Sequence, residues 1–175
     1  MYKRQDDTEH GKPFTANDLR ILWTHKDNEV VEFLLIMCYS GYRISAYKTL
    51  KVDLIKKYFR GGVKTAAGKD RIVPIHSSIA PLVKNRLKRS TTLLTDSPHD
   101  YRLKMYETLK ELGISHHTPH DCRHTFSKLC EKYNVNENDR KRMLGHAFKD
   151  ITNKVYGHRE LEDLKTEIEK IKVCY

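Results

Sequence analysis

The sequence predicts a mainly α-helical domain that carries one small antiparallel β-sheet, an α+β fold. Two observations support this prediction. Apolar residues recur at helical spacing on both sides of a central segment, and within residues 52–75 short strand-like runs alternate with glycine-containing turns. The length of 175 residues suffices for one domain with a buried core. We therefore expect one domain over residues 13–175, preceded by a polar linker or loose chain end, residues 1–12.

Two helices are expected ahead of the sheet. Thr15 is suited to cap the first helix, with Asp18 at its third position. The apolar face of this helix consists of Leu19, Leu22 and Trp23. The second helix runs through the largely apolar residues 30–37, which predicts burial, and ends near Gly41, because glycine favours a helix stop.

The central segment predicts strands joined by tight turns. The strand-like runs are Val52-Asp53-Leu54, Tyr58-Phe59, Val63-Lys64-Thr65 and Arg71-Ile72-Val73-Pro74. Gly61-Gly62 and Ala67-Gly68-Lys69-Asp70 are turn sequences, so the runs pair as a small antiparallel sheet. Lys64 is expected on a strand, just before a turn.

Helical patterns resume after the sheet. They cover about residues 77–89, 100–112, 119–133, 137–144 and 158–172. Thr118-Pro119 is the clearest start signal, with a capping hydroxyl and proline at the first helical position. This start places His120 and Arg123 on one face, one turn apart, near a helix N-terminus that favours anions.

The charge balance favours an anionic partner. Lys and Arg total 33 against 23 Asp and Glu, a formal net charge of +10. The basic residues are spread along the chain, and any one basic run is explained as well by a solvated surface as by nucleic acid. Taken together, the basic residues favour DNA as the partner only if the chain also carries a set of phosphate-binding residues.

Cysteine usage and hydropathy suggest a cytoplasmic location. The four cysteines form no CxxC pair, and Cys38 lies in an apolar run typical of a buried thiol. We expect all four to be reduced, as in the cytosol. The longest apolar run, within residues 30–38, is too short to span a bilayer, and no signal-peptide pattern is present.

Several motifs in order resemble those of the tyrosine recombinases of the phage integrase family. They are Ser40-Gly41-Tyr42-Arg43-Ile44-Ser45, Pro119-His120-Asp121-Cys122-Arg123-His124-Thr125-Phe126, Met143-Leu144-Gly145-His146, and the segment from Thr152 to Tyr156-Gly157-His158. The resemblance covers about residues 12–172, which is the catalytic domain of that family, so it implies the tyrosine recombinase catalytic-domain fold. The family's N-terminal core-binding domain is expected to be absent from this chain.

The chemistry of phosphodiester cleavage fits this resemblance. Attack loads negative charge on the non-bridging oxygens, which the planar, permanently charged forks of Arg43 and Arg123 can clamp. The resemblance implies four further roles: Lys64 protonates the departing 5′ oxygen, His120 transfers a proton at the nucleophile, His146 bonds the phosphate, and Tyr156 forms a 3′-phosphotyrosine. A phenol has a pKa of about 10, so the nucleophile needs a base or cationic surroundings.

The resemblance implies an integrase of a phage or an integrative mobile element that cuts and rejoins double-stranded DNA at attachment sites. It further implies a homo-oligomer on DNA, a tetrameric synapse, with accessory DNA-bending or directionality proteins as further partners, in a bacterial cytoplasm. The covalent link conserves phosphodiester energy, so neither a cofactor nor a metal is expected. The lack of a GxxxxGK[ST] loop agrees with that expectation.

Two further features concern the orientation of Arg43 and the chain's C-terminal region. The family commonly has an acidic residue directly after the Arg-x-Ser stretch, where this chain has Ala46, so the groups that orient Arg43 must come from elsewhere. Leu161, Leu164, Ile168 and Ile171 form an amphipathic pattern. This helix can pack on its own domain, whereas the resemblance implies docking on a neighbouring subunit.

Alternatives remain for single residues and for the whole chain. Taken alone, Arg43 fits a surface ion pair, Tyr156 a packed aromatic, and His120 and His146 cap or packing roles. His120 and His124 also resemble an HExxH zinc helix, with Asp121 in place of Glu, which would make the chain a metallopeptidase. A DNA-binding module without catalysis is the other alternative. Type IB topoisomerases share the phosphotyrosine chemistry, but the L-G-H and Y-x-H contexts are more similar to integrases.

Overall fold

The computed structural model describes residues 11–62, 70–147, 159–173 and 175. Its helices are α1 (Ala16–Thr24), α2 (Glu29–Cys38), the 3-10 helix η1 (Ile44–Lys48), α3 (Ala80–Arg89), α4 (Pro98–Glu111), α5 (Pro119–Lys132), α6 (Glu137–Leu144) and α8 (Leu161–Ile168). Its strands are β1 (Lys51–Asp53), β2 (Tyr58–Gly61) and β3 (Arg71–Pro74). The predicted α+β class, mainly helical with a small antiparallel sheet, is confirmed.

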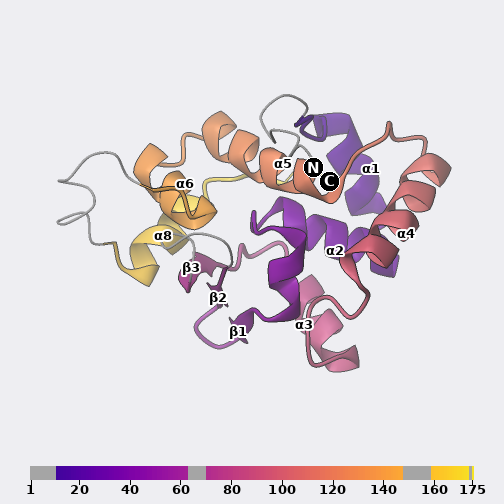
Figure 1. The fold of residues 1–175 in the computed structure, drawn as a ribbon. Coiled ribbons are helices and arrows are strands. Elements are labelled where there is room, and N and C mark those ends of the chain that lie inside the picture. The colour runs from indigo at the N-terminus through magenta and orange to yellow at the C-terminus, as the bar shows by residue number, and fades with distance from the viewer. Residues whose placement is uncertain (1–10, 63–69, 148–158, 174) are drawn as a thin grey trace, which may run out of the picture.

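Helix α2 is the centre of the core. Asn28 caps it by accepting from the N–H groups of Val30 and Val31, and residues 31–38 are all buried. Helices α1, α3, α4 and α5 pack against it, which Figure 1 shows as a ring of helices around the purple α2. The buried Glu32 pairs with Arg89 at 2.6 Å and Arg86 at 3.3 Å, which fastens α2 to α3.

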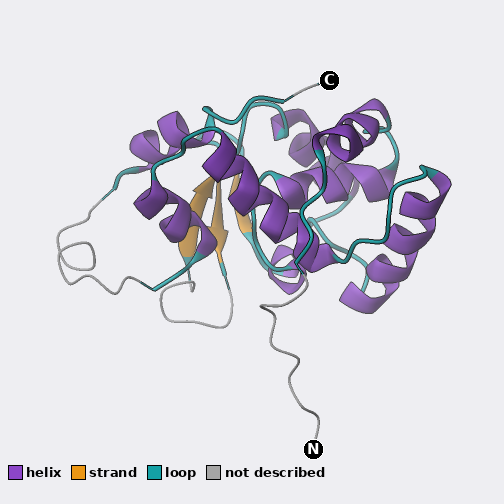
Figure 2. Ribbon diagram, turned by 90° about the horizontal axis from the view of Figure 1, so that it is seen from above, coloured by secondary structure: helices purple, strands orange, loops and turns teal. Residues whose placement is uncertain are grey.

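The sheet has the order β1-β2-β3 with antiparallel pairing. Val52 pairs with Phe59, and Phe59 pairs with Val73. Phe59 and Val73 are fully buried, so the sheet turns one face to the core. Helices α6 and α8 pack against β3, and Figure 2 shows the strands flanked by helices. The predicted strand Val63-Lys64-Thr65 lies outside the described residues.

Helix α8 packs on its own domain and is shorter than predicted. It spans Leu161–Ile168 rather than residues 158–172, of which residue 158 is not described. Ile171 is nevertheless buried in the hydrophobic core, and its carbonyl accepts a bond of 2.8 Å from the Nε2 of the buried His76. The Glu167 carboxylate accepts from the N–H of Asn136 at 2.7 Å, which ties α8 to the start of α6. The amphipathic pattern is therefore satisfied within one chain.

The structure also bears on the cysteines and on the length of the apolar helices. Cys38, Cys122 and Cys130 are buried free thiols, whereas Cys174 lies outside the described residues. Burial raises the pKa of the Cys130 thiol to about 12, so it stays protonated and unreactive at neutral pH. In the parts of the chain that the structure describes, no helix is both long enough and apolar enough to cross a membrane.

Candidate functional site

Helix α5 presents the first two candidate residues as the sequence predicted. It begins at Pro119, directly after Thr118. The Asp121 carboxylate accepts from the N–H of Thr118 at 3.1 Å, which satisfies a backbone donor at the helix start. His120 and Arg123 therefore lie one turn apart on one face of the helix.

Arg123 joins three segments of the chain. Its guanidinium donates to the carbonyl of Gly41 at 2.7 Å and to the carbonyl of Leu144 at 2.6 Å. The first carbonyl lies two residues before Arg43, and the second lies two residues before His146. Arg123 thus brings the Arg43 loop and the end of α6 to the same side of α5. The residue is 6% exposed, so these bonds are shielded from water.

Positive charges crowd around Arg123. Burial, together with the nearby charges of Arg43 and Arg71, lowers the pKa of Arg123 to about 10. The guanidinium is still cationic at neutral pH. A bound anion would stabilise this arrangement, because its negative charge would offset the repulsion among the arginines.

The loop that carries Arg43 is held by a tyrosine rather than by an acidic residue. The Tyr47 hydroxyl bonds the Ser40 hydroxyl at 2.6 Å and accepts from the N–H of Tyr42 at 3.2 Å. Gly41 has φ +75°, and a Cβ there would lie 2.4 Å from the Phe126 ring, so only glycine fits. These contacts hold the backbone just before Arg43, where Ala46 offers no carboxylate.

Arg43 itself is half-buried and stands at the N-cap of η1. Among the described residues, none accepts a hydrogen bond from its guanidinium or forms an ion pair with it. An arginine has five N–H donors in a fixed fork. The guanidinium of Arg43 therefore retains donors that an incoming anion can use.

His146 follows a glycine that ends α6. Gly145 adopts the left-handed conformation, with φ 72° and ψ 28°, so the chain turns sharply after Leu144. His146 is exposed. The pKa of His146 is lowered first by partial desolvation and then by the positive charges of Arg123, Arg140, Arg43 and Arg71. The imidazole is therefore neutral at pH 7 and can donate or accept one hydrogen bond.

Arg71 is a member of this cluster that the sequence motifs did not indicate. It is 9% exposed, and its Nε donates to the carbonyl of Met143 at 2.8 Å. Its guanidinium carbon lies 4.3 Å from the centre of the Tyr42 ring. The one available signal was the alternation in β3, which places Arg71 on the same side as the buried Val73. A charged residue on a buried strand face is a candidate for function.

The six predicted site residues divide into three groups. Arg43, Arg123 and His146 are brought together. His120 is half-buried on the first turn of α5, edge-on to His124 with 4.7 Å between ring centres. Lys64 and Tyr156 lie outside the described residues.

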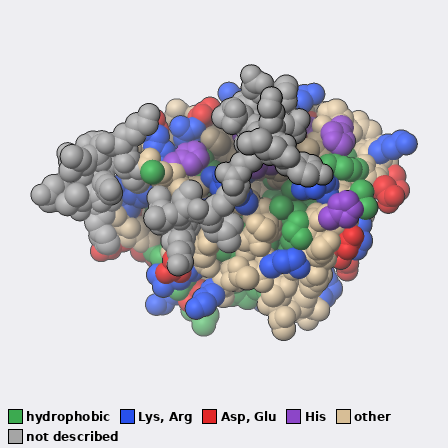
Figure 3. All heavy atoms as spheres, viewed as in Figure 1, with side chains coloured by type: hydrophobic (Ala, Val, Ile, Leu, Met, Phe, Trp, Pro, Cys, Tyr) green, Lys and Arg blue, Asp and Glu red, His purple; other side chains and the backbone are tan. Residues whose placement is uncertain are grey.

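The face of the molecule seen in Figure 3 carries both basic and acidic side chains. Figure 3 shows Lys and Arg side chains spread over the face that it presents, with several histidines among them. The spread agrees with the formal net charge of +10. A polyanion that binds to such a face releases its bound counterions, so its affinity for the protein should fall as the salt concentration rises.

The described side chains do not support the zinc site that the metallopeptidase alternative requires. Over the described ranges, no three His, Cys, Asp or Glu side chains are grouped to hold a metal ion. Asp121, which would act as the base, is bonded instead to Thr118, His117 and Lys12. His120 and His124 pack edge to face.

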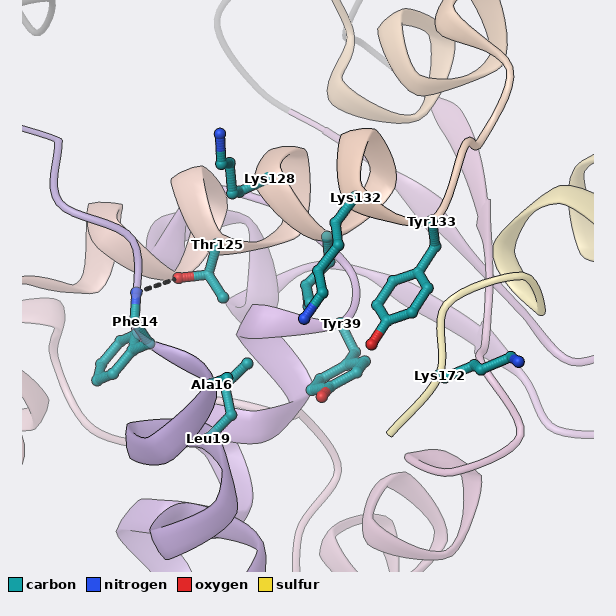
Figure 4. Close-up of a pocket in the computed structure, with 10 residues that line it drawn as sticks. Phe14, Ala16, Leu19, Tyr39, Thr125, Lys128, Lys132, Tyr133 and Lys172 are labelled. Atoms are coloured by element: carbon teal, nitrogen blue, oxygen red, sulfur yellow. Dashed lines mark hydrogen bonds between the residues drawn. The ribbon is translucent and has the colours of Figure 1, made fainter. Parts of the chain in front are cut away.

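A separate apolar pocket of about 140 Å³ lies on another face of α5. Figure 4 shows Lys132, the last residue of α5, and Tyr133, just after it, pointing into the pocket toward Tyr39. The bond from the N–H of Phe14 to Thr125 lies beside them. At 100° per residue, Thr125 and Lys132 lie about 180–200° around the helix from Arg123. The pocket is therefore distinct from the arginine cluster, and none of the four predicted residues that the structure describes lines it.

Comparisons with known proteins identify a matching family model and curated relatives. Residues 12–162 match the model of the phage integrase family. The tyrosine recombinase XerA of Pyrococcus horikoshii is 27% identical over 181 residues, covering 93% of this chain and 62% of the relative. XerA of Saccharolobus solfataricus is 30% identical over 148 residues, covering 81% of this chain and 49% of the relative. The chain thus spans about half to three fifths of the length of these curated relatives.

Solved structures show the same fold. An integrase from mycobacterium phage Brujita aligns with a TM-score of 0.71 and 15% identity, over 98% of this chain and 62% of that chain. The Tn1549 transposon integrase in complex with circular intermediate DNA aligns with a TM-score of 0.67 and 19% identity, over 95% and 67% of the two chains. At these identities the likeness concerns the fold.

Proposed function

This chain belongs to the phage integrase family, and we propose that it forms the catalytic part of a site-specific DNA recombinase. The proposed enzyme is an integrase of a phage or an integrative mobile element. It cuts one strand at a time and rejoins it through a 3′-phosphotyrosine. The alternative that remains is a DNA-binding module of the same fold without catalysis.

The observation that carries the proposal is the bridge made by Arg123. By bonding the carbonyls of Gly41 and Leu144, it gathers Arg43 and His146, two groups that are 103 residues apart (146 minus 43) in the chain. Two guanidinium groups and a neutral imidazole that bond one phosphate would match the charge that develops on its oxygens during attack. A surface that only bound the DNA backbone would not need buried arginines at a common point.

The reaction can be written with its atoms balanced. The Tyr156 phenol oxygen bonds to phosphorus as the bond from phosphorus to the 5′ oxygen breaks. The phenol proton passes to His120, and Lys64 gives a proton to the departing 5′ oxygen. Arg43, Arg123 and His146 hold the non-bridging oxygens throughout. Rejoining is the reverse reaction with a 5′ hydroxyl of another strand as the nucleophile, so no external energy source is required.

The proposed partner is double-stranded DNA that contains an attachment site. The Tn1549 transposon integrase, which shares this fold, was solved in complex with circular intermediate DNA, and the basic surface of this chain fits the same class of ligand. We also propose a homo-oligomer on DNA, a tetrameric synapse, because exchange needs two duplexes cut at once. We also keep two predictions from the sequence. One is that accessory DNA-bending or directionality proteins take part, and the other is a bacterial cytoplasmic location.

Covalent capture on DNA tests the proposal. The probe is a pool of duplexes with random sequence around a fixed nick, placed so that the short cleaved fragment diffuses away and prevents rejoining. We expect a protein–DNA adduct that survives SDS and is absent in Tyr156→Phe. The captured strands should be enriched in particular sequences. Binding to DNA without any adduct in the unmodified chain would refute catalysis and favour the DNA-binding module.

A further inference from the structure

Two arginines from different elements fasten the same two segments. Arg123 on α5 bonds the carbonyls of Gly41 and Leu144. Arg71 on β3 covers the Tyr42 ring and bonds the carbonyl of Met143. The four contacted residues are therefore two consecutive pairs, one just before Arg43 and one at the end of α6. One arginine alone would allow the two segments to pivot about it, whereas two fix their relative orientation.

Arg71 is itself held in place from both sides. The Tyr42 hydroxyl donates to the backbone carbonyl of Arg71 at 3.1 Å, so ring and guanidinium are locked in one arrangement. The backbone of Arg71 pairs with Gly61 in the neighbouring strand. The guanidinium is cationic in a buried position, where a charge is costly unless it is hydrogen-bonded or stacked. Such a placement suits a residue whose geometry matters.

The charge of Arg71 also acts on the candidate site. Desolvation lowers the pKa of Arg71, and the charge of Arg43 lowers it further. Arg71 in turn contributes to the low pKa of Arg123 and of His146. These mutual effects agree with the geometry, in which Arg71 and Arg123 bond consecutive carbonyls at the end of α6, two to three residues before His146. A residue that served only to pack the strand would not need a charge here, since it repels Arg43 and Arg123.

We propose that Arg71 is a positioning residue for strand cleavage. It holds the Arg43 loop against the end of α6, so that Arg43, Arg123 and His146 can share one phosphate. Arg71 is the first residue of β3, and its contacts therefore also fix the start of that strand. This inference rests on the proposed recombinase function.

Single-turnover cleavage separates positioning from binding. The probe is a nicked duplex chosen from the captured pool, titrated against Arg71→Met, Arg71→Lys and the matched control Arg60→Met. Arg60 is exposed on β2, one strand away, and its replacement removes the same charge. We expect Arg71→Met to lower the rate at saturating DNA by about 100-fold, as displacements near 1 Å can do. The DNA concentration for half-saturation should change by less than about threefold, because two arginines and the basic surface remain.

Arg71→Lys and the control Arg60→Met show whether the planar guanidinium or only the charge is needed. Arg71→Lys keeps the charge and can reach Met143 but has no planar group for Tyr42, so we expect a rate between Arg71→Met and the unmodified chain. Arg60→Met should cleave at the unmodified rate. A folded Arg71→Met that cleaves normally at saturating DNA would overturn the proposal, as would a loss confined to DNA affinity. If Arg71→Met does not fold, Arg71→Lys decides: the proposal needs a rate at saturation that is slower by about tenfold.

A second readout does not depend on cleavage. NMR titration of His146 in the DNA-free chain should give a higher pKa in Arg71→Met than in the unmodified chain, because one positive charge near the imidazole is gone. Arg71→Lys should leave the value close to the unmodified one. If both the ring signals and the pKa of His146 are unchanged in Arg71→Met, Arg71 does not hold the end of α6 in place, and the inference is overturned. If the unmodified chain forms no adduct, the proposed function fails, and this titration still decides whether Arg71 belongs to the site.

Discussion

Asp139 binds Arg159 through a two-pronged ion pair, with Nε at 3.1 Å from Oδ1 and Nη2 at 2.9 Å from Oδ2. Asp139 is fully buried on α6 and also accepts from Arg142. Arg159 lies three residues after Tyr156. The pair therefore fastens the chain just beyond the proposed nucleophile to the helix that ends next to His146.

Removal of Asp139 should destabilise the protein. Asp139→Ala leaves Arg142 and Arg159 without their shared carboxylate, and breaking a buried pair costs more than breaking a surface pair. We expect the Tm to fall by roughly 5 °C or more. The matched control is Glu137→Ala on the same helix, whose exposed carboxylate pairs with Lys141 at 3.0 Å and whose loss should barely move the Tm. Equal shifts in the two variants, measured by thermal unfolding, would contradict this assignment.

Arg43 and Arg123 should differ in what they contribute to stability. Arg123→Met leaves the buried carbonyls of Gly41 and Leu144 without this donor, so both stability and cleavage should fall. Arg43→Met removes a guanidinium with no bonded partner among the described residues, so cleavage alone should fall. We expect a loss of about 100- to 1,000-fold in rate for either variant. Parallel unfolding and single-turnover assays check the contrast, and a strong loss of stability in Arg43→Met would refute it.

Tyr47 should matter for rate as well as for stability. Its hydroxyl bonds Ser40 and the N–H of Tyr42, so Tyr47→Phe frees the loop that carries Arg43. Tyr101→Phe is the matched control, because Tyr101 is equally buried and its hydroxyl donates to the carbonyl of Val30 at 2.8 Å, within the helical core. Each change should cost about 1 kcal/mol. Slower cleavage is expected only for Tyr47→Phe; equal rates in the two variants would count against the role of Tyr47.

The low pKa of His146 makes a pH prediction with a defined sign. The unfolded chain titrates this histidine near pH 6.5, and desolvation and the arginines lower the folded value. Between the two values the unfolded state binds more protons, so stability rises with pH there and falls as pH drops below about 6.5. His146→Asn should flatten this dependence. Urea unfolding at several pH values measures it, and a folded-state His146 pKa by NMR at or above about 6.5 would rule this dependence out.

The sequence predicted the parts of the fold that depend on local signals. Thr118-Pro119 set the start of α5, and the apolar stretch after Asn28 set α2. The boundaries that failed depend on distant contacts. The predicted helix at residues 77–89 begins only at Ala80, because Ser77 bonds Glu169 through its N–H and its hydroxyl. The C-terminal helix ends at Ile168, because His76 binds the carbonyl of Ile171.

The candidate site shows the same division. The motifs predicted Arg43, His120, Arg123 and His146, since each lies in a short recognisable context. Arg71 could not be found in this way, because its partner Met143 is 72 residues away and no local pattern records the pairing. The bonds of the Tyr47 hydroxyl to Ser40 and to the N–H of Tyr42 likewise became visible only in the three-dimensional arrangement of the loop.

Identification of the residue that becomes attached to DNA is the decisive experiment for the proposed mechanism. Protein captured on the nicked duplex is digested with protease and nuclease, and mass spectrometry locates the peptide that carries a 3′-phosphoryl nucleotide. We predict attachment at Tyr156, with the adduct lost in Tyr156→Phe and strongly reduced in Arg43→Met. Attachment at any other residue, or an adduct that persists in Tyr156→Phe, would contradict the mechanism.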